Sequence, residues 1–469
     1  MRPAHYRVAV ADEIHFDRRM SDAEALMWRL EKDPHLASSY ATFTVLDRPL
    51  DFDRFKRRMA IAIDHVPRLR QRVQPAPGSL APPAWVDDAN FDLDHHVRHV
   101  ALPKPGNLRQ LADLATLIAA DPFDRVRPLW QFVVVDGLRG GKGGLIQKLH
   151  HTVTDGEGGV RLSLQYLDLE RDAPGPVANA DRSYVEHSGD DPAATVRDLI
   201  ASGLRLPLAL VKQIRDLLAE PARIPTVGQA ALETVRGIVT QLSEHDKAHS
   251  PLWTTRSLRR HVEPIRFPLD VVKAAAKALD GTINTAFITA AAAAAGEYHR
   301  KLDRPVDELR ASMAISTRTS GSGSNAFSLA RMLVPTSEMP IADRFRAITA
   351  ATATARASSA SASLSTVAAL ATTLPTSVLT RIARQQGETV DFATSNVRAA
   401  PISVYIAGAK VLENYPIGPL AGVAFNLTLL SYAGSLDMGL NLDPAPITEP
   451  TLLKNCVEAA FSELASLAP

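Results

Sequence analysis

The run His150-His151-Thr152-Val153-Thr154-Asp155-Gly156 follows an apolar stretch, residues 145–149, and precedes a glycine-rich stretch with helical spacing. This order predicts a strand, a short turn and a helix. Adjacent side chains on a strand point to opposite faces of its sheet. Only one of the two histidines can therefore face a given cleft, and the other must pack or form hydrogen bonds behind it.

The chemistry that such a histidine permits is general-base catalysis. A neutral imidazole can take a proton from an alcohol or an amine as that group attacks an activated acyl carbon. Asp155 is placed to fold back and hold the local backbone or to pair with an arginine, and Gly156 favours a turn that a side chain would resist. A histidine pair that is only structural is the alternative. The Asp-Gly at this spacing, between a strand and a helix, favours a functional site.

The composition of the whole chain narrows the class of protein. Its 469 residues carry a formal net charge of +1, 46% hydrophobic residues, 6% aromatic residues and one cysteine, Cys456. The near-zero charge argues against a nucleic-acid-binding protein, which needs basic residues to neutralise phosphates. A single cysteine excludes a disulfide framework and a multi-cysteine zinc site, and it fits a reducing compartment.

No segment of the sequence predicts a secretion signal or a transmembrane helix. The N-terminus lacks an apolar stretch with a small-residue cleavage site, and no window of about 20 residues stays apolar and uncharged. We therefore expect a soluble, intracellular protein. Residues 196–219 set basic side chains among apolar ones, so this segment is either a helix packed on its own domain or a helix that lies on an anionic membrane.

The hydrophobic periodicity predicts an α+β protein built from two mixed blocks. A segment rich in Asp, Pro, Gly, Ser and Asn, residues 171–192, separates the blocks. We predict a first half-domain over residues 1–175 that carries the histidine motif. A linker with an amphipathic helical segment is predicted over residues 176–257, and a second half-domain over residues 258–469.

The His-His-x-x-x-Asp-Gly motif resembles that of the coenzyme-A-dependent acyltransferases that share the chloramphenicol acetyltransferase and condensation-domain fold. Resemblance to one branch, the bacterial wax ester synthase/diacylglycerol acyltransferases, runs through most of the chain. That branch has Leu-Asp-Arg-x-Arg-Pro-Leu-Trp ahead of the histidines, where this sequence has Phe123-Asp124-Arg125-Val126-Arg127-Pro128-Leu129-Trp130. Other elements follow in the family's order: Ser21-Asp22-Ala23, Asp94-His95-His96-Val97-Arg98-His99, Ser395-Asn396-Val397, Tyr415-Pro416-Ile417-Gly418-Pro419 and Leu427-Thr428-Leu429-Leu430-Ser431-Tyr432.

The resemblance implies a two-layer α/β fold of two chloramphenicol-acetyltransferase-like, or condensation-domain-like, domains with a tunnel at their interface. It implies that His151 is the general base, that His150 supports the site without transferring the proton, and that Asp155 is chiefly structural. Further supporting or substrate-binding positions are implied at Gly156, Asn284, Ser395 and Asn396. Of these, Asn284 and Asn396 are candidate donors to the developing oxyanion.

The resemblance also implies the substrates. Long-chain acyl-CoA would be the acyl donor and co-substrate, and the hydroxyl of diacylglycerol or of a fatty alcohol would be the acceptor. No further cofactor, no metal and no nucleic acid is expected. Such an enzyme would work in the cytoplasm or in peripheral contact with the inner membrane or lipid droplets. Two alternatives stay open: an acyltransferase for another specialised alcohol, and a weakly catalytic lipid-binding or scaffold member of the fold.

Two departures from the family pattern concern the choice of substrate. Family members commonly have Asn-Asp where this chain has Asn284-Thr285, and Pro-Gly-Pro where it has Arg398-Ala399-Ala400. The histidine motif itself is complete. We therefore expect the acyl-transfer chemistry to be retained, with an acceptor or chain-length preference that can differ from that of other members.

Three other features favour structural roles. His95 and His96 form a second pair, but no Asp-Gly follows them, and residues 91–100 predict a strand, so packed or solvated side chains are expected. The glycine cluster at residues 140–144 lies between two predicted strands and predicts a hairpin turn, not a phosphate-binding loop. Cys456 lies in a predicted terminal helix, where we expect a buried small hydrophobe away from the histidine motif.

Overall fold

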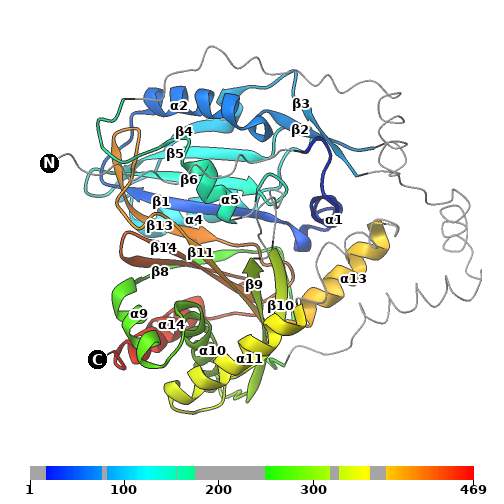
Figure 1. Ribbon diagram of the computed structural model, residues 1–469, viewed down its shortest axis with the longest axis vertical. Coiled ribbons are helices and arrows are strands. Elements are labelled where there is room, and N and C mark those ends of the chain that lie inside the picture. Colours follow the sequence, from blue (N-terminus) through cyan, green and yellow to red (C-terminus); the bar gives the residue numbers. More distant parts are fainter. Residues whose placement is uncertain are drawn as a thin grey trace, which may run out of the picture.

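The computed structural model describes residues 17–76, 82–154, 156–174, 249–316, 327–359 and 376–468. In this part of the chain two larger β-sheets lie one above the other in the view of Figure 1, with helices packed around them. The predicted mixed α/β class is confirmed.

The first sheet has seven strands in the order β4-β5-β6-β1-β13-β12-β7. Its strands are β1 (Ser39–Leu46), β4 (Val97–Ala101), β5 (Trp130–Leu138), β6 (Lys142–His150), β7 (Leu167–Asp168), β12 (Tyr405–Ile406) and β13 (Ala409–Ile417). In its centre β1 pairs antiparallel with β6, which places Ser39 opposite His150. The hairpin of β5 and β6 turns at Gly140 and Gly141, whose φ angles are 81° and 71°. The predicted hairpin turn is therefore confirmed.

The second sheet has six strands in the order β10-β9-β11-β14-β15-β8. Its strands are β8 (His261–Pro268), β9 (Glu308–Ser316), β10 (Phe327–Pro335), β11 (Phe392–Arg398), β14 (Phe425–Tyr432) and β15 (Ser435–Leu442). A small separate sheet pairs β2 (Gln71–Gln74) with β3 (Ala84–Asp87).

Helices cover both sheets (Figure 1). Beside the first sheet lie α1 (Asp22–Leu30), α2 (Phe52–His65), α3 (Leu93–His96), α4 (Leu108–Ala120) and α5 (Gly156–Ser163). Beside the second lie α9 (Leu269–Ala278), α10 (Ile283–Lys301), α11 (Ile341–Ser359) and α14 (Pro450–Ala465), whereas α13 (Thr376–Glu388) packs against α1 and η1. Short 3-10 turns are η1 (Pro34–Leu36) and η2 (Pro67–Leu69). The alanine-rich α10 is buried on most sides, and a Cβ at its Gly296 would lie 2.1 Å from the carbonyl oxygen of Thr336. Small side chains here allow close helix packing.

Strands from the C-terminal part of the sequence complete the first sheet. Strands β12 and β13 lie within the range predicted for the second half-domain, 258–469, yet they pair in the first sheet. Strand β13 runs antiparallel to β1, with Ala41 opposite Ile417, and the Tyr415 ring stacks on Phe43 at 5.1 Å between ring centroids. Local periodicity contains no information on such pairing. No single boundary in the sequence therefore separates the strands of one sheet from those of the other.

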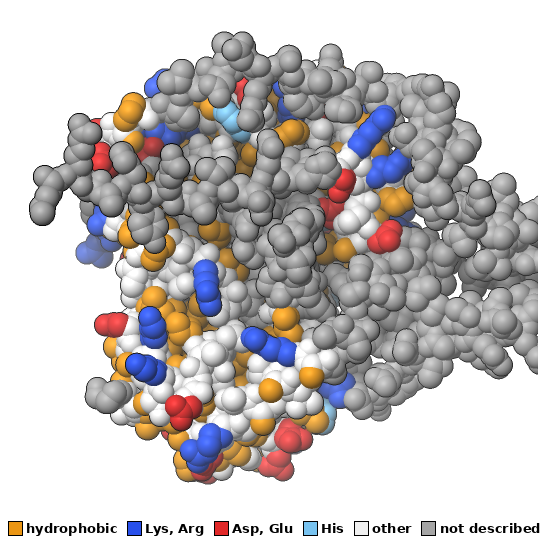
Figure 2. Space-filling model, viewed as in Figure 1, with side chains coloured by type: hydrophobic (Ala, Val, Ile, Leu, Met, Phe, Trp, Pro, Cys, Tyr) orange, Lys and Arg blue, Asp and Glu red, His pale blue; other side chains and the backbone are white. Residues whose placement is uncertain are grey.

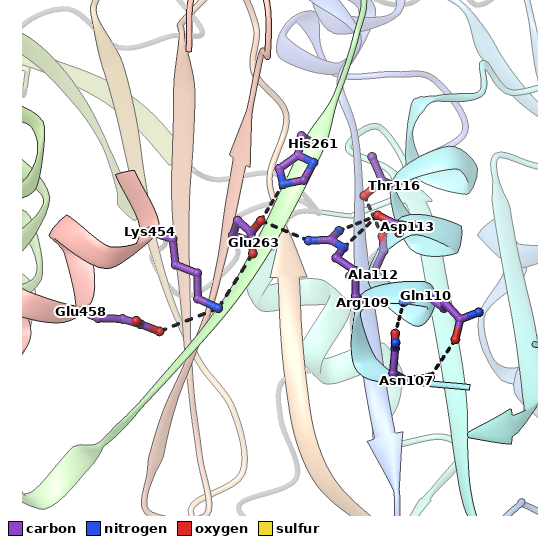
Figure 3. Close-up of polar contacts among 10 residues, drawn as sticks. All are labelled: Asn107, Arg109, Gln110, Ala112, Asp113, Thr116, His261, Glu263, Lys454 and Glu458. Atoms are coloured by element: carbon purple, nitrogen blue, oxygen red, sulfur yellow. Dashed lines mark hydrogen bonds and ion pairs between the residues drawn. The ribbon is translucent and has the colours of Figure 1, made fainter. Parts of the chain in front are cut away.

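A polar cluster joins the two blocks on the side of α4 (Figure 3). The Glu263 carboxylate of β8 lies 3.3 Å from Arg109 of α4, 2.6 Å from His261 and 3.9 Å from Lys454 of α14. Burial acts to raise the pKa of Glu263, but these cationic and hydrogen-bonding neighbours together hold it below its usual value. An ionised carboxylate thus links an N-terminal helix to a C-terminal strand and helix.

One local prediction is wrong. Residues 91–100 do not form one strand, because residues 93–96 form the short helix α3, and β4 begins only at Val97. The Asp92 side chain accepts a hydrogen bond from the backbone N–H of Asp94 at 2.9 Å, which favours a helical turn over continued extension.

Three further predictions concern Cys456, residues 196–219 and membrane-spanning helices. Cys456 is buried in the core of the second sheet, as expected. The amphipathic segment 196–219 lies outside the described residues. Among the helices that are described, none is long and apolar enough to cross a bilayer. Figure 2 shows that described Lys and Arg side chains over the C-terminal helices are interspersed with hydrophobic and acidic ones.

Candidate active site

The two histidines of the motif have opposite surroundings. His150 ends β6 and is fully buried, whereas His151 begins the following turn and is partly exposed. Nε2 of His150 lies 2.5 Å from Oε2 of Glu31, and its Nδ1 lies 2.7 Å from the hydroxyl of Thr152. The backbone N–H of Thr152 also donates to Nδ1, at 3.1 Å. Both ring nitrogens of His150 are therefore engaged inside the protein.

The carboxylate beside His150 is held in its ionised form. Burial acts to raise the pKa of Glu31, but the hydrogen bond and the charge of His150, with Arg125 and Ser39, together lower it below its ordinary value. Oε1 of Glu31 accepts a hydrogen bond from the Ser39 hydroxyl at 3.4 Å. The end of α1 is thus tied to the strands that carry the motif.

His151 is placed by its backbone and by one aromatic ring. Its N–H donates to the carbonyl of Ser38 at 3.0 Å. The Tyr40 ring lies against the imidazole, at 4.7 Å between centroids and an angle of 45°. A Cβ at Gly159 of α5 would lie only 2.6 Å from the Tyr40 hydroxyl oxygen, so the helix after the motif approaches Tyr40 closely because this position is glycine.

The remaining predicted site residues come from both blocks. Asp155 lies outside the described residues, and Gly156 begins α5. Helix α5 contacts β11, the strand that carries Ser395 and Asn396. The Asn396 amide nitrogen lies 3.4 Å from the side-chain oxygen of Asn284, at the start of α10. The structure therefore brings Asn284 into contact with Asn396. The strand that carries Asn396, β11, packs against α5, the helix that follows the histidines.

The segment from Phe123 to Trp130 packs behind His150. The Phe123 ring meets His150 edge-on at 6.4 Å between centroids. The Arg125 guanidinium lies 3.5 Å over the ring of Trp28 in α1 and donates to the Trp28 carbonyl at 2.8 Å. This segment and the end of α1 thus form one wall of the histidine site.

The second histidine pair is structural, as predicted. His96 is buried between two rings, with its centroid 5.2 Å from that of Phe91 and 4.7 Å from that of Trp130. Its Nδ1 lies 2.7 Å from the Trp130 carbonyl oxygen. Burial is the main reason that the pKa of His96 is lowered to about 4, so the ring is neutral at physiological pH.

Three site residues were not found by the reasoning from sequence: Glu31, Tyr40 and Lys148. Lys148 is 1% exposed and lies on β6, and its ammonium group stands 4.2 Å over the Phe123 ring. A lysine two residues before His150, in a mostly apolar strand, is the one sequence signal for this residue. Glu31 and Tyr40 lie far from the motif in sequence, and no spacing rule relates them to it.

No group of three or more His, Cys, Asp or Glu side chains that could hold a metal ion occurs among the described residues.

Comparison with known proteins identifies the family. Residues 20–287 match the model of the wax ester synthase/diacylglycerol acyltransferase catalytic domain, and residues 323–465 match that of the WS/DGAT C-terminal domain. The chain belongs to this family. It is accordingly an O-acyltransferase of the WS/DGAT type, and the two blocks joined at α5 and β11 correspond to the two family domains.

Relatives and solved structures agree with this assignment. A Mycobacterium tuberculosis protein named as a candidate diacylglycerol O-acyltransferase is 34% identical, over 96% of this chain and 93% of its own. A second M. tuberculosis protein, tgs1, which is also named as a candidate diacylglycerol O-acyltransferase, is 27% identical, over 93% of both chains.

Two solved structures show the same fold. The WS/DGAT of Marinobacter aquaeolei VT8 has a TM-score of 0.66 at 20% identity, over 96% of this chain and 99% of that chain. The first condensation domain of the calcium-dependent antibiotic synthetase has a TM-score of 0.58 at 18% identity, over 97% of both.

Proposed function

We propose that this WS/DGAT member transfers a long-chain acyl group from acyl-CoA to the hydroxyl of diacylglycerol or of a fatty alcohol, with His151 as the general base. The relatives named as diacylglycerol O-acyltransferases support the first acceptor, and the family's wax ester synthases support the second. The donor and the acceptor would meet in a tunnel between the two blocks.

One observation carries the choice of base. His150 has Nε2 against Glu31 and Nδ1 against Thr152, and its side chain is completely buried. A ring so engaged has no nitrogen to offer to an external alcohol. His151 is partly exposed in the turn that leads into α5, so its imidazole is the one that a substrate hydroxyl can approach.

The proposed reaction needs one base and no bound cofactor. His151 accepts the hydroxyl proton while the oxygen attacks the thioester carbonyl, and a tetrahedral intermediate forms. As the intermediate collapses, the carbon–sulfur bond breaks, and the leaving CoA thiolate takes the proton from the His151 imidazolium. The products are one ester and free CoA.

The other predicted residues would support this step. Asn284 or Asn396 would donate to the negative charge that develops on the carbonyl oxygen, because such donors stabilise the transition state more than the ground state. Ser395 would support the site or contact a substrate. Asp155 and Gly156 would hold the turn and the start of α5.

Substitution of His151 tests the proposal. His151→Ala should lower the rate of CoA release from palmitoyl-CoA and acceptor by about 100-fold or more while the circular dichroism spectrum stays unchanged. His99→Ala is a matched control, because His99 is a 40% exposed histidine on the edge strand β4. Wild-type activity in His151→Ala would refute the proposed base.

The acceptor is tested separately. Purified enzyme would be given labelled palmitoyl-CoA with diacylglycerol, a fatty alcohol or a set of other alcohols, and the esters would be resolved by chromatography. We expect triacylglycerol or wax ester as the main product. Ester formed only with another alcohol would replace the proposed acceptor and leave the acyl-transfer chemistry intact. Flotation with anionic vesicles would test the proposed peripheral contact with membranes or droplets.

A further inference from the structure

Glu31 stands directly behind the histidine motif. It caps the C-terminus of α1, at the end of the first sheet where β1 begins and β6 ends (Figure 1). Its carboxylate forms the 2.5 Å contact with Nε2 of His150, and its side chain is only 13% exposed. Because the pair is shielded from water, the electrostatic attraction between the ring nitrogen and the ionised carboxylate is stronger than it would be at the surface.

The contacts of Nδ1 indicate which ring nitrogen of His150 carries the proton. A backbone N–H can only donate, so the N–H of Thr152 makes Nδ1 of His150 an acceptor. With Nδ1 accepting, a neutral ring carries its proton on Nε2, the nitrogen that lies 2.5 Å from Glu31. The ring bridges a carboxylate on one side and the backbone of the turn on the other.

We propose that Glu31 is a positioning residue for acyl transfer: its carboxylate anchors the ring of His150, and that ring holds the Thr152 backbone and thereby the turn that carries His151. This inference rests on the proposed role of His151 as the base. The turn is held on both sides of His151, because the His151 N–H donates to Ser38 at 3.0 Å and the next N–H donates to the anchored ring.

The neighbours of Glu31 hold its side chain in one position. Ser39 donates to its other oxygen, and Arg125 lies near enough for its charge to act on the carboxylate. The edge-on Phe123 ring limits the movement of the imidazole. Removing the carboxylate would leave Nε2 buried without its polar neighbour, which costs free energy and favours a different ring position.

Two substitutions separate this role from a general loss of stability. Glu31→Ala removes the acceptor, whereas Glu31→Gln keeps an oxygen that can accept from Nε2–H. We expect Glu31→Ala to lower kcat about 10-fold or more, as substitutions of the partners that orient functional histidines do, with little change in KM for palmitoyl-CoA. Glu31→Gln should recover most of the lost rate. Ser39→Ala is the matched control, because it removes only the weaker 3.4 Å contact of Glu31, and it should retain near-wild-type kcat.

Two measurements other than activity report directly on the contacts between Glu31, His150 and Thr152. A proton held between Glu31 and Nε2 of His150 should give a far-downfield resonance that is present in the wild type, shifted upfield in Glu31→Gln and absent in Glu31→Ala. Hydrogen exchange of the Thr152 amide should be faster in Glu31→Ala only. If Glu31→Ala does not fold, the resonance and kcat of Glu31→Gln still decide the matter.

An unchanged resonance and unchanged exchange in the substituted proteins would overturn the inference, even if activity fell. Failure of the proposed function has a different signature. In that case His151→Ala would retain activity, whatever Glu31 does to the resonance and to the turn.

Discussion

The side-chain amide of Asn396 donates a hydrogen bond to the side-chain oxygen of Asn284 over 3.4 Å, although 112 residues separate the two in sequence. Asn284 lies in the first turn of α10, and Asn396 lies on β11, which contacts α5. Among the described residues, the amide nitrogen of Asn284 has the sulfur of Met313 as its acceptor, at 4.0 Å, and sulfur is a weak acceptor. The pair therefore has N–H groups to offer near the helix that follows the histidines.

Substitution of this pair should slow the chemical step. We expect Asn284→Ala and Asn396→Ala each to lower kcat by about 10- to 100-fold, because an oxyanion donor acts mainly in the transition state. KM for the donor should change little, and steady-state kinetics of CoA release would measure both. Since the two residues are in contact, the double variant should lose less than the product of the single losses. Full activity in both single variants would exclude an oxyanion role for the pair.

Local sequence pattern specifies only part of the site. The hairpin of β5 and β6, with the turn and helix after His150, follows from apolar spacing and glycine positions, and the structure has all of them. Asn284 and Asn396 were available only through family resemblance, because no local rule relates a helix start to a distant strand. The pairing of β13 with β1 and the contact of Glu31 with His150 depend on long-range packing, which periodicity does not encode.

Gly159 provides a test of how closely α5 must approach the site. Alanine is favoured over glycine inside a helix by about 1 kcal/mol, so Gly159→Ala would be stabilising if the position were open. A Cβ there would lie 2.6 Å from the Tyr40 hydroxyl oxygen, and Tyr40 packs on His151. We therefore expect Gly159→Ala to lower kcat by about 10-fold, without the gain in thermal stability that helix propensity alone predicts.

The hydroxyl of Tyr40 should account for that loss. Tyr40→Phe removes the oxygen that the new Cβ would meet and keeps the ring against His151. Combining it with Gly159→Ala should restore most of the activity, as measured by CoA release, while Tyr40→Phe alone serves as the control. A Gly159→Ala variant as active as the wild type would show that the helix can shift without disturbing His151.

Lys148 is a buried charge whose cost should be visible in the pH dependence of stability. It is 1% exposed, its ammonium group donates to the Asp121 carbonyl, and it stands over the Phe123 ring. Burial lowers the pKa of Lys148 to about 8, against the opposing attraction of Asp121 and Glu31. In the unfolded chain a lysine titrates near 10.4, so between these two values the unfolded state binds more protons and stability rises with pH.

The comparison with Lys148→Met isolates this effect, because methionine is uncharged and fills a similar volume. Between pH 7.5 and 9.5 the wild type should gain about 2 kcal/mol in free energy of unfolding relative to Lys148→Met, since the folded form loses the buried charge while the unfolded form keeps its proton. Urea denaturation of both proteins at the two pH values would measure the difference, and titrations common to both cancel. Curves that stay parallel across this range would show that Lys148 has the same proton affinity in the folded and unfolded states, contrary to its position in the core of β6.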